Sequence, residues 1–257
     1  MKTIALLSLF AVSLVTGCSI NSSSNSAPAD DSLHSAGIAT NQIKVALSAQ
    51  SGDQNVKVYA SLHAYAANGD SKHVTLDQGD VLTASVAGLD AFVLTLQPDN
   101  GGDVTYTATL PVAMAAEDVT IAFVRGAGKT SAPNSIVHVP LPFTMTTDTT
   151  SLKYGSPVSV KVTPAPTTAT TFEVSGPCLA SDGNDSLTAP TLDANGVGTI
   201  NTQQIKLSST SSSCSVGLFL STYDDDGKID SAFAGGFIGL GDTEGQQKRG
   251  LIVTMNP

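Results

Sequence analysis

Residues 56–66 alternate strictly between two kinds of side chain. Small or apolar residues occupy one set of positions, and larger or polar residues occupy the other: Val56, Val58, Ala60, Leu62, Ala64 and Ala66 against Lys57, Tyr59, Ser61, His63 and Tyr65. A period of two predicts a β-strand with one buried face, not a helix. Asn68-Gly69 follows, and this pair readily takes the positive φ of a hairpin turn. The chain must therefore supply antiparallel partners for this strand.

Short apolar segments separated by turn residues recur along the chain. Further strands are predicted at residues 43–48, 73–76, 81–86, 92–96, 104–110, 119–125, 135–140, 158–163, 171–174, 197–200, 215–221 and 251–255. Short strands with frequent Gly, Pro, Asn and Asp between them are typical of an antiparallel sandwich. Nearly all the acidic residues are aspartates, which favour turns over helices. The predicted fold class is all-β, with two tandem antiparallel β-sandwich domains.

Composition divides the chain into four parts. Residues 1–17 form a signal peptide, and residues 18–38 form a flexible tether rich in Ser, Asn, Ala, Pro and Asp, with few apolar residues. The β-sandwich domains are predicted at 39–146 and 147–257. The two predicted domains end in similar apolar tetrads, residues 136–139 and 251–254, which indicates a weak tandem duplication.

The first residues read as a targeting segment. A positive Met1-Lys2 precedes the apolar run 4–15, which is too short to span a bilayer. The run ends in Leu14-Val15-Thr16-Gly17-Cys18, which resembles the lipobox of bacterial lipoproteins, with Val15 where the family more often has leucine. The resemblance implies cleavage before Cys18 and lipidation of that cysteine. An ordinary cleaved signal peptide with an incidental Cys18 is the alternative.

Ser19 follows the cysteine, as in Gram-negative lipoproteins sorted to the outer membrane. The resemblance therefore implies a protein held at the outer membrane by the lipid on Cys18, facing the periplasm or the surface. Several acyl chains together bind a membrane firmly, whereas one binds it only marginally.

With Cys18 assigned to lipid, Cys178 and Cys214 remain, and an even remainder in an oxidising compartment predicts one disulfide. Such a bond would stabilise the fold by roughly 3–4 kcal/mol. Zinc is the rival, but no histidine follows His138 to complete a ligand set.

Two short stretches resemble bacterial immunoglobulin-like domains. Residues 193–200 (Asp-Ala-Asn-Gly-Val-Gly-Thr-Ile) resemble the turn and strand late in such repeats, and residues 103–108 resemble the approach to their penultimate strand. This resemblance makes Tyr106 a candidate tyrosine corner. The chain has no Trp, so the expected likeness is one of architecture.

The net charge of −10, with scattered Lys and Arg, argues against a nucleic-acid partner.

Two segments resemble parts of functional motifs but lack residues or context that those motifs require. Residues 126–130 (Gly-Ala-Gly-Lys-Thr) match the end of a phosphate-binding loop, but Phe123 occupies the first glycine position and a strand is predicted to follow. Residues 184–187 resemble the nucleophile block of GDSL-type esterases, but all four histidines precede Ser186.

The acidic segment 224–230 resembles part of an EF-hand calcium loop, in which Asp224, Asp226 and Asp230 would supply oxygens. Thr222 and Phe233, however, stand where that loop has its first aspartate and its bidentate glutamate. The competing interpretation is a solvated turn. No other metal or cofactor is expected. Two further candidates for ligand contact are the strand face formed by Tyr59, Ser61, His63 and Tyr65, and the Gly-rich segment 232–241. The alternative for the first is an ordinary exposed strand face, and the alternative for the second is a core hairpin.

These features favour a non-enzymatic, lipid-anchored envelope protein that acts as a binding, spacer or assembly module. Its expected partners are the membrane, through Cys18, and another envelope protein. A periplasmic or surface hydrolase with a site built from loops is the alternative.

Overall fold

The computed structural model describes residues 32–256 apart from 53, 78, 99–103, 113–117, 169, 181–183, 209–212 and 237–241. The described chain is built from strands, with three short 3-10 turns: η1 (Ser35–Gly37), η2 (Thr40–Gln42) and η3 (Thr202–Gln204). The all-β prediction is therefore confirmed. Within this described part, no helix is long and apolar enough to cross a membrane.

The first of two hydrophobic cores lies between two layers of strands. One layer is a four-stranded sheet of β10 (Ala132–His138), β9 (Asp118–Val124), β5 (Val81–Ser85) and β6 (Phe92–Val93). The facing layer contains β1 (Leu33–His34), β4 (Ser71–Thr75), β3 (Val56–Tyr65), β2 (Lys44–Ser51), β8 (Val104–Leu110) and β7 (Thr95–Pro98). The alternation in residues 56–62 has the expected effect, because Val56, Val58, Ala60 and Leu62 are completely buried in this core.

The second core also lies between two layers. A three-stranded sheet of β11 (Thr144–Thr147), β13 (Pro157–Thr163) and β16 (Val197–Asn201) forms one layer. The other layer contains β12 (Ser151–Lys153), β14 (Thr170–Ser175), β15 (Asn184–Leu187), β17 (Cys214–Asp224) and β18 (Thr243–Asn256). Phe172, Leu218 and Ile205 are completely buried here.

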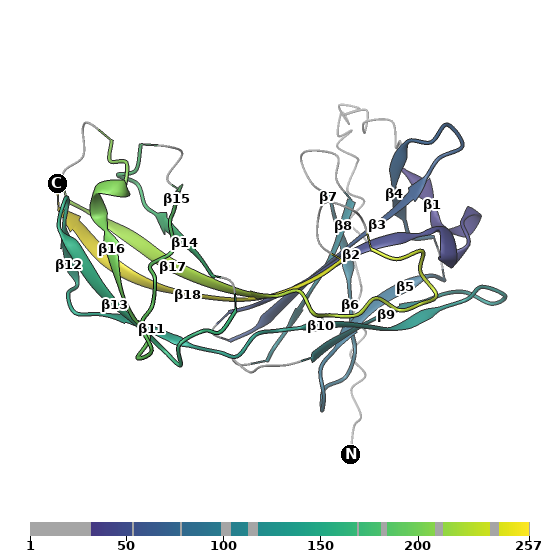
Figure 1. Ribbon diagram of the computed structural model, residues 1–257. Helices are drawn as coiled ribbons and strands as arrows, with labels where there is room; N and C mark the ends of the chain where they lie inside the picture. The colour runs from purple at the N-terminus through teal and green to yellow at the C-terminus, as the bar shows by residue number, and fades with distance from the viewer. Residues whose placement is uncertain are drawn as a thin grey trace, which may run out of the picture. The chain divides into compact units, whose positions relative to one another are not determined.

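One long strand belongs to both cores. The first part of β18 pairs in parallel with β2 of the first core, from Thr243↔Leu47 to Gln247↔Ser51. Its second part carries Val253 and Met255 into the second core. A single 11-stranded sheet therefore runs through both sandwiches, with β18, the yellow strand of Figure 1, passing from one to the other.

A second connection comes from residues 228–236, which the sequence placed in the second domain. Phe233 belongs to the first core and stacks on Phe123, with ring centroids 5.8 Å apart and planes 3° from parallel. The Ala234 amide donates to the Ile43 carbonyl. Conversely, Phe143 and Met145, placed in the first domain, lie in the second core. The division of the body into domains 39–146 and 147–257 stays a prediction.

The predicted tether ends earlier than residue 38. Leu33 and His34 form β1, which pairs in parallel with β4, and residues 35–37 form η1. The physical reason is a set of hydrogen bonds that hold this segment on the body: Arg125 donates to its carbonyls, and the carboxylates of Asp77 and Asp80 accept from it.

The Ig-like stretches form the elements expected of them only in part. Asp193 Oδ1 accepts from the amides of Asn195 and Val197, and Gly196 has a φ of 75°, so the turn before β16 is confirmed. The Tyr106 hydroxyl accepts from the Leu76 amide at 2.8 Å, thirty residues upstream. A tyrosine corner bonds to backbone only a few residues away, so Tyr106 instead ties β8 to the end of β4.

Cys178 and Cys214 form the predicted disulfide, with their Cα atoms 6.1 Å apart. The bond links the loop after β14 to the first residue of β17 beside the second core.

Candidate functional site

One open feature of the shared sheet is a gap along one edge of β18. On one side β18 pairs with β17 continuously from Gly245 to Met255. On the other side its pairing with β2 ends at Gln247, and its pairing with β12 begins at Thr254. Among the strands that the structure describes, residues 248–253 therefore have a neighbour on one edge only.

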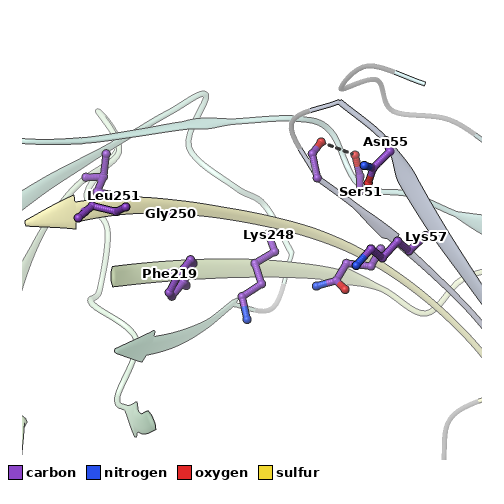
Figure 2. A pocket seen from close by; sticks show the side chains of 10 residues that line it. Ser51, Asn55, Lys57, Phe219, Lys248, Gly250 and Leu251 are labelled. Carbon is purple, nitrogen blue, oxygen red and sulfur yellow. Dashed lines mark hydrogen bonds between the residues drawn. The ribbon is translucent and has the colours of Figure 1, made fainter. Parts of the chain in front are cut away.

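A groove of about 500 Å³ lies at this gap, and we call it the β18 groove. Its lining residues come from the β2–β3 hairpin, from β17 and from β18: Gln50, Ser51, Gly52, Asn55, Lys57, Phe219, Lys248, Gly250, Leu251 and Ile252. Figure 2 shows Lys57 and Asn55 at the hairpin end, with Phe219 and Lys248 on the two adjacent strands.

The surface of the groove is shaped by an aromatic ring lying over two glycines. A Cβ atom on Gly217 or on Gly250 would lie 2.5 Å from a carbon of the Phe219 ring. Only glycine at these positions lets the ring lie flat across the strands, an arrangement that compensates for the missing side chains in a sheet. The Lys248 ammonium stands 5.1 Å from the Phe219 ring centroid.

The groove is locally cationic. Lys57 is exposed, and Lys248 makes a 2.6 Å ion pair with Glu173, which lies outside the lining. Among the lining residues that the structure describes there is no carboxylate. Asp53, in the same hairpin, lies outside the described residues. Within the described lining, the positive charge of Lys57 is the one without a carboxylate partner, in a chain whose net charge is −10.

The phosphate-loop fragment is part of a hairpin, as its sequence context indicated. Gly128 has a φ of 84° in the turn between β9 and β10, and no helix follows it. The Lys129 ammonium donates to the carbonyls of Ser35 and Ala36. The lysine thus holds the segment before β2, a structural role that accounts for its position.

Beside this hairpin lies a buried polar cluster, the Arg125 cluster, made of Ser35, Thr40, Asp80 and Arg125. The side chains of Arg125 and Asp80 are 0% and 4% exposed, with Nη2 and Oδ2 2.9 Å apart. Arg125 Nη1 also donates to Thr40 Oγ1 and to the Ile38 carbonyl, and Nη2 donates to the Ser35 carbonyl. Through these hydrogen bonds the cluster anchors residues 35–40 to the body.

The two aspartates of this region have lowered pKa values. Burial raises the pKa of Asp80, but the Gly126 amide, Arg125 and Ser35 together lower it below its ordinary value. For Asp77 the Ala36 amide is the largest cause of a lowered pKa. Both carboxylates therefore bind the segment in their ionised form.

The three aspartates of the calcium hypothesis do not share one environment. Asp230 is 8% exposed, and its two oxygens accept from the amides of Asn134 and Ala232. Asp224 Oδ1 accepts from the amide of Asp226, as in a turn. Nearby, burial and the Asp225 charge raise the pKa of Glu244. Asp230 is thus part of the packing against β10, whereas Asp224 and Asp226 form the turn.

Replacing Asp224 and Asp226 together by asparagine is expected to leave the melting temperature nearly unchanged, with or without calcium. Asparagine keeps the side-chain oxygen of the turn, and exposed like charges interact weakly. Thermal unfolding followed by circular dichroism measures the effect. Asp230→Ala is the contrasting variant, with an expected loss of about 1–3 kcal/mol because two partly buried amides lose their acceptor.

A real calcium site would behave differently, since an ion bound only to the native state at a hundredfold excess over its Kd adds roughly 2.7 kcal/mol. A calcium-dependent rise in melting temperature that the double variant abolishes would contradict the turn interpretation. Across the described ranges, no group of three or more His, Cys, Asp and Glu side chains is arranged to hold a metal ion.

The strand face suggested as a ligand platform contains a serine–histidine contact. Ser61 Oγ and His63 Nε2 are 2.9 Å apart, and the Ser61 hydroxyl also reaches the Val104 carbonyl at 3.3 Å. The His63 ring lies against that of His73, opposite it in the β3–β4 register, with centroids 4.4 Å apart. His63 is only 6% exposed. A nucleophile also needs a substrate cavity, and Ser61 lines none of the grooves described here.

Two further cavities have no lining residue on β18. One, of about 390 Å³, is bordered by the proline-rich connections 140–143 and 164–168 and by Thr222 and Asp224. Thr222 Oγ1 is buried there and has no hydrogen-bond partner among the described residues. The other, of about 450 Å³, borders the Arg125 cluster.

Several predicted site residues cannot be compared with the structure. Cys18 lies outside the described residues, as do Phe237 and Leu240 of the Gly-rich segment. Ser186 lies on β15, whose backbone pairs with β14. The sequence reasoning missed the β18 groove, because residues 243–250 contain no periodic apolar side chain. The available signal was Phe219 with Gly217 two residues before it on the same strand and Gly250 opposite it on the paired strand.

No family model matches the chain, and no curated protein matches it. A crystal structure of murine CEACAM1b aligns with 82% of this chain and 100% of that chain, at 9% sequence identity and a TM-score of 0.21. A likeness at this level carries no argument about function, so the description of the site rests on the chain's own geometry.

Proposed function

We propose that this chain is a lipid-anchored, non-enzymatic binding module of the bacterial envelope, and that the β18 groove is its ligand site. The observation that carries the proposal is the gap in the shared sheet, where residues 248–253 lie beside an open, locally cationic groove. Exposed backbone edges of this kind are usually paired or covered in a protein with no use for them.

The anchor supports the same proposal. A lipid on Cys18, followed by a tether that reaches the body at Leu33, would hold the groove near an outer-membrane surface. There its partner would be another envelope protein. The grooves described above bring together no nucleophile, base and carboxylate, which favours binding over hydrolysis.

The anchor is tested by Cys18→Ser. The variant is expected to leave the membrane fraction after a carbonate wash, while the parent chain stays in it and incorporates labelled palmitate. A variant that remains in the washed membranes without lipid would contradict the assignment of Cys18.

The groove is tested by placing a photo-crosslinking amino acid at position 57 in intact cells. A matched control places it at Tyr65, which is 59% exposed on the same strand but away from the groove. A defined adduct from position 57 and none from position 65 is expected. Equal labelling from both positions, or none from either, would contradict the groove as the binding site.

A further inference from the structure

We infer that the open edge of β18 receives an extended peptide segment of the partner as an added strand, and that this segment presents carboxylate side chains toward the groove. The inference rests on the proposed function, since it specifies the partner's chemistry at the same site. Addition of a strand to an exposed edge takes its affinity from main-chain hydrogen bonds and its specificity from the flanking side chains.

The length of the edge fits one short strand. The β2 pairing ends with Gln247↔Ser51 and the β12 pairing begins with Ser151↔Thr254. The six residues between these registers span about 20 Å at roughly 3.3 Å per residue. The neighbouring strands therefore limit an added segment to about six residues.

The backbone groups of alternate residues on β18 face this edge. The Thr254 amide donates to the Thr150 carbonyl, on the β12 side. The Lys248 carbonyl accepts from Arg249 Nη1, which also donates to the Ser51 carbonyl, on the β2 side. Because the amide and carbonyl of one residue in a strand point the same way, residues 250 and 252 also face the gap. Both residues are exposed, Ile252 by 79%.

The side chains around the gap specify the chemistry of the segment. On the outer face, Ile252 and the Phe219 ring provide apolar surface and Lys57 provides positive charge, while Lys248 is ion-paired with Glu173. The Lys57 side chain has no hydrogen-bond or ion-pair partner within the described part of the chain. Side chains of an added strand alternate between the two faces of the sheet. A segment of alternating acidic and apolar residues would therefore place its carboxylates on the Lys57 face and its apolar side chains on the face of Leu251, which packs against the second core. A lysine-rich segment would meet like charge at the same positions.

The mature chain with Cys18→Ser is titrated into fluorescein-labelled six-residue peptides, and binding is followed by anisotropy. One peptide alternates valine with glutamate, one alternates valine with lysine, and a third is the glutamate peptide with N-methyl groups on one backbone edge. The glutamate peptide is expected to bind at least about tenfold more tightly than the other two, since each lacks charge pairing or main-chain hydrogen bonds.

Substitutions in the protein test the same contacts from the other side. Ile252→Pro removes one outward amide and should weaken binding by about tenfold, whereas Ile252→Thr keeps the amide and should bind within about threefold of the parent chain. Lys57→Gln should weaken binding by about threefold, and Lys161→Gln, an exposed lysine on β13, should not. Circular dichroism shows whether Ile252→Pro remains folded, and the N-methylated peptide tests the main-chain bonds without altering the protein.

Equal binding of the glutamate and lysine peptides, or insensitivity to N-methylation, would overturn the inference. Self-association that Ile252→Pro abolishes in the absence of peptide would also overturn it, because a second copy would then be the strand's partner. A crosslink from position 57 in cells together with no peptide binding would refute strand addition alone and leave the proposed function standing.

Discussion

Replacing Arg125 by alanine is expected to lower the free energy of unfolding by about 3–5 kcal/mol at pH 7. The substitution leaves the Asp80 carboxylate buried without its guanidinium partner, and it removes the donors that hold the carbonyls of Ser35 and Ile38. Urea unfolding of the mature chain measures the change. The matched control is the double replacement Arg125→Met with Asp80→Leu, which removes both charges and should cost less than Arg125→Ala.

The cost of Arg125→Ala is also expected to depend on pH. The pKa of Asp80 is lowered in the folded protein, so its ionised form stabilises the native state above the unfolded pKa of about 3.9, and that contribution is lost as the pH falls through the folded pKa. The difference between the parent chain and the variant should therefore shrink below about pH 4. A difference that stays constant from pH 7 to pH 3 would contradict an ion-pair role for Arg125.

Replacing Phe233 by alanine is expected to cost about 3–5 kcal/mol, the usual range for removing a buried phenylalanine. Phe233 is 7% exposed and stacks on Phe123 of the first core, although it lies far along the chain in the second half. Leu141→Ala is the control, because Leu141 is 68% exposed and an exposed truncation usually changes stability by less than about 0.5 kcal/mol.

Hydrogen exchange locates the effect of Phe233→Ala. Amides of β2, β5 and β9 should lose protection first, because these strands surround the first core, while β13 and β16 should change less. Loss of protection confined to the second core would contradict the placement of Phe233.

The strands that the sequence predicts correctly are those whose buried residues are apolar and alternate. This pattern occurs on β3 and on β13, where the alternate apolar residues are all buried: Val56, Val58, Ala60, Leu62, Val158, Val160 and Val162. The first half of β18 was missed for the opposite reason. Its buried positions are Thr243, Gly245, Gln247 and Arg249. Because none of these residues is apolar, the sequence shows no alternation of hydrophobic residues there.

These inward polar residues lie where the chain crosses between the cores. The Gln247 amide donates to the Pro140 carbonyl, and a Cβ on Gly245 would clash with the carbonyl of His138. The residues that make these two contacts, Pro140 and His138, lie more than a hundred positions earlier in the chain. Single-sequence patterns describe local periodicity, so neither the shared strand nor the groove beside it could be predicted from them.

The shared strand has a consequence for the order in which the chain can fold. A polypeptide is synthesised, and crosses a membrane, with its N-terminus first, yet the strand that pairs with β2 begins at residue 243. Contacts between residues so far apart in sequence form slowly, since a long loop must close before they stabilise anything. The N-terminal sandwich thus stays incomplete, with part of β2 unpaired on one side and without Phe233, until residues 233–247 have emerged. Maturation of the two halves is therefore coupled, and the C-terminal strand completes both together.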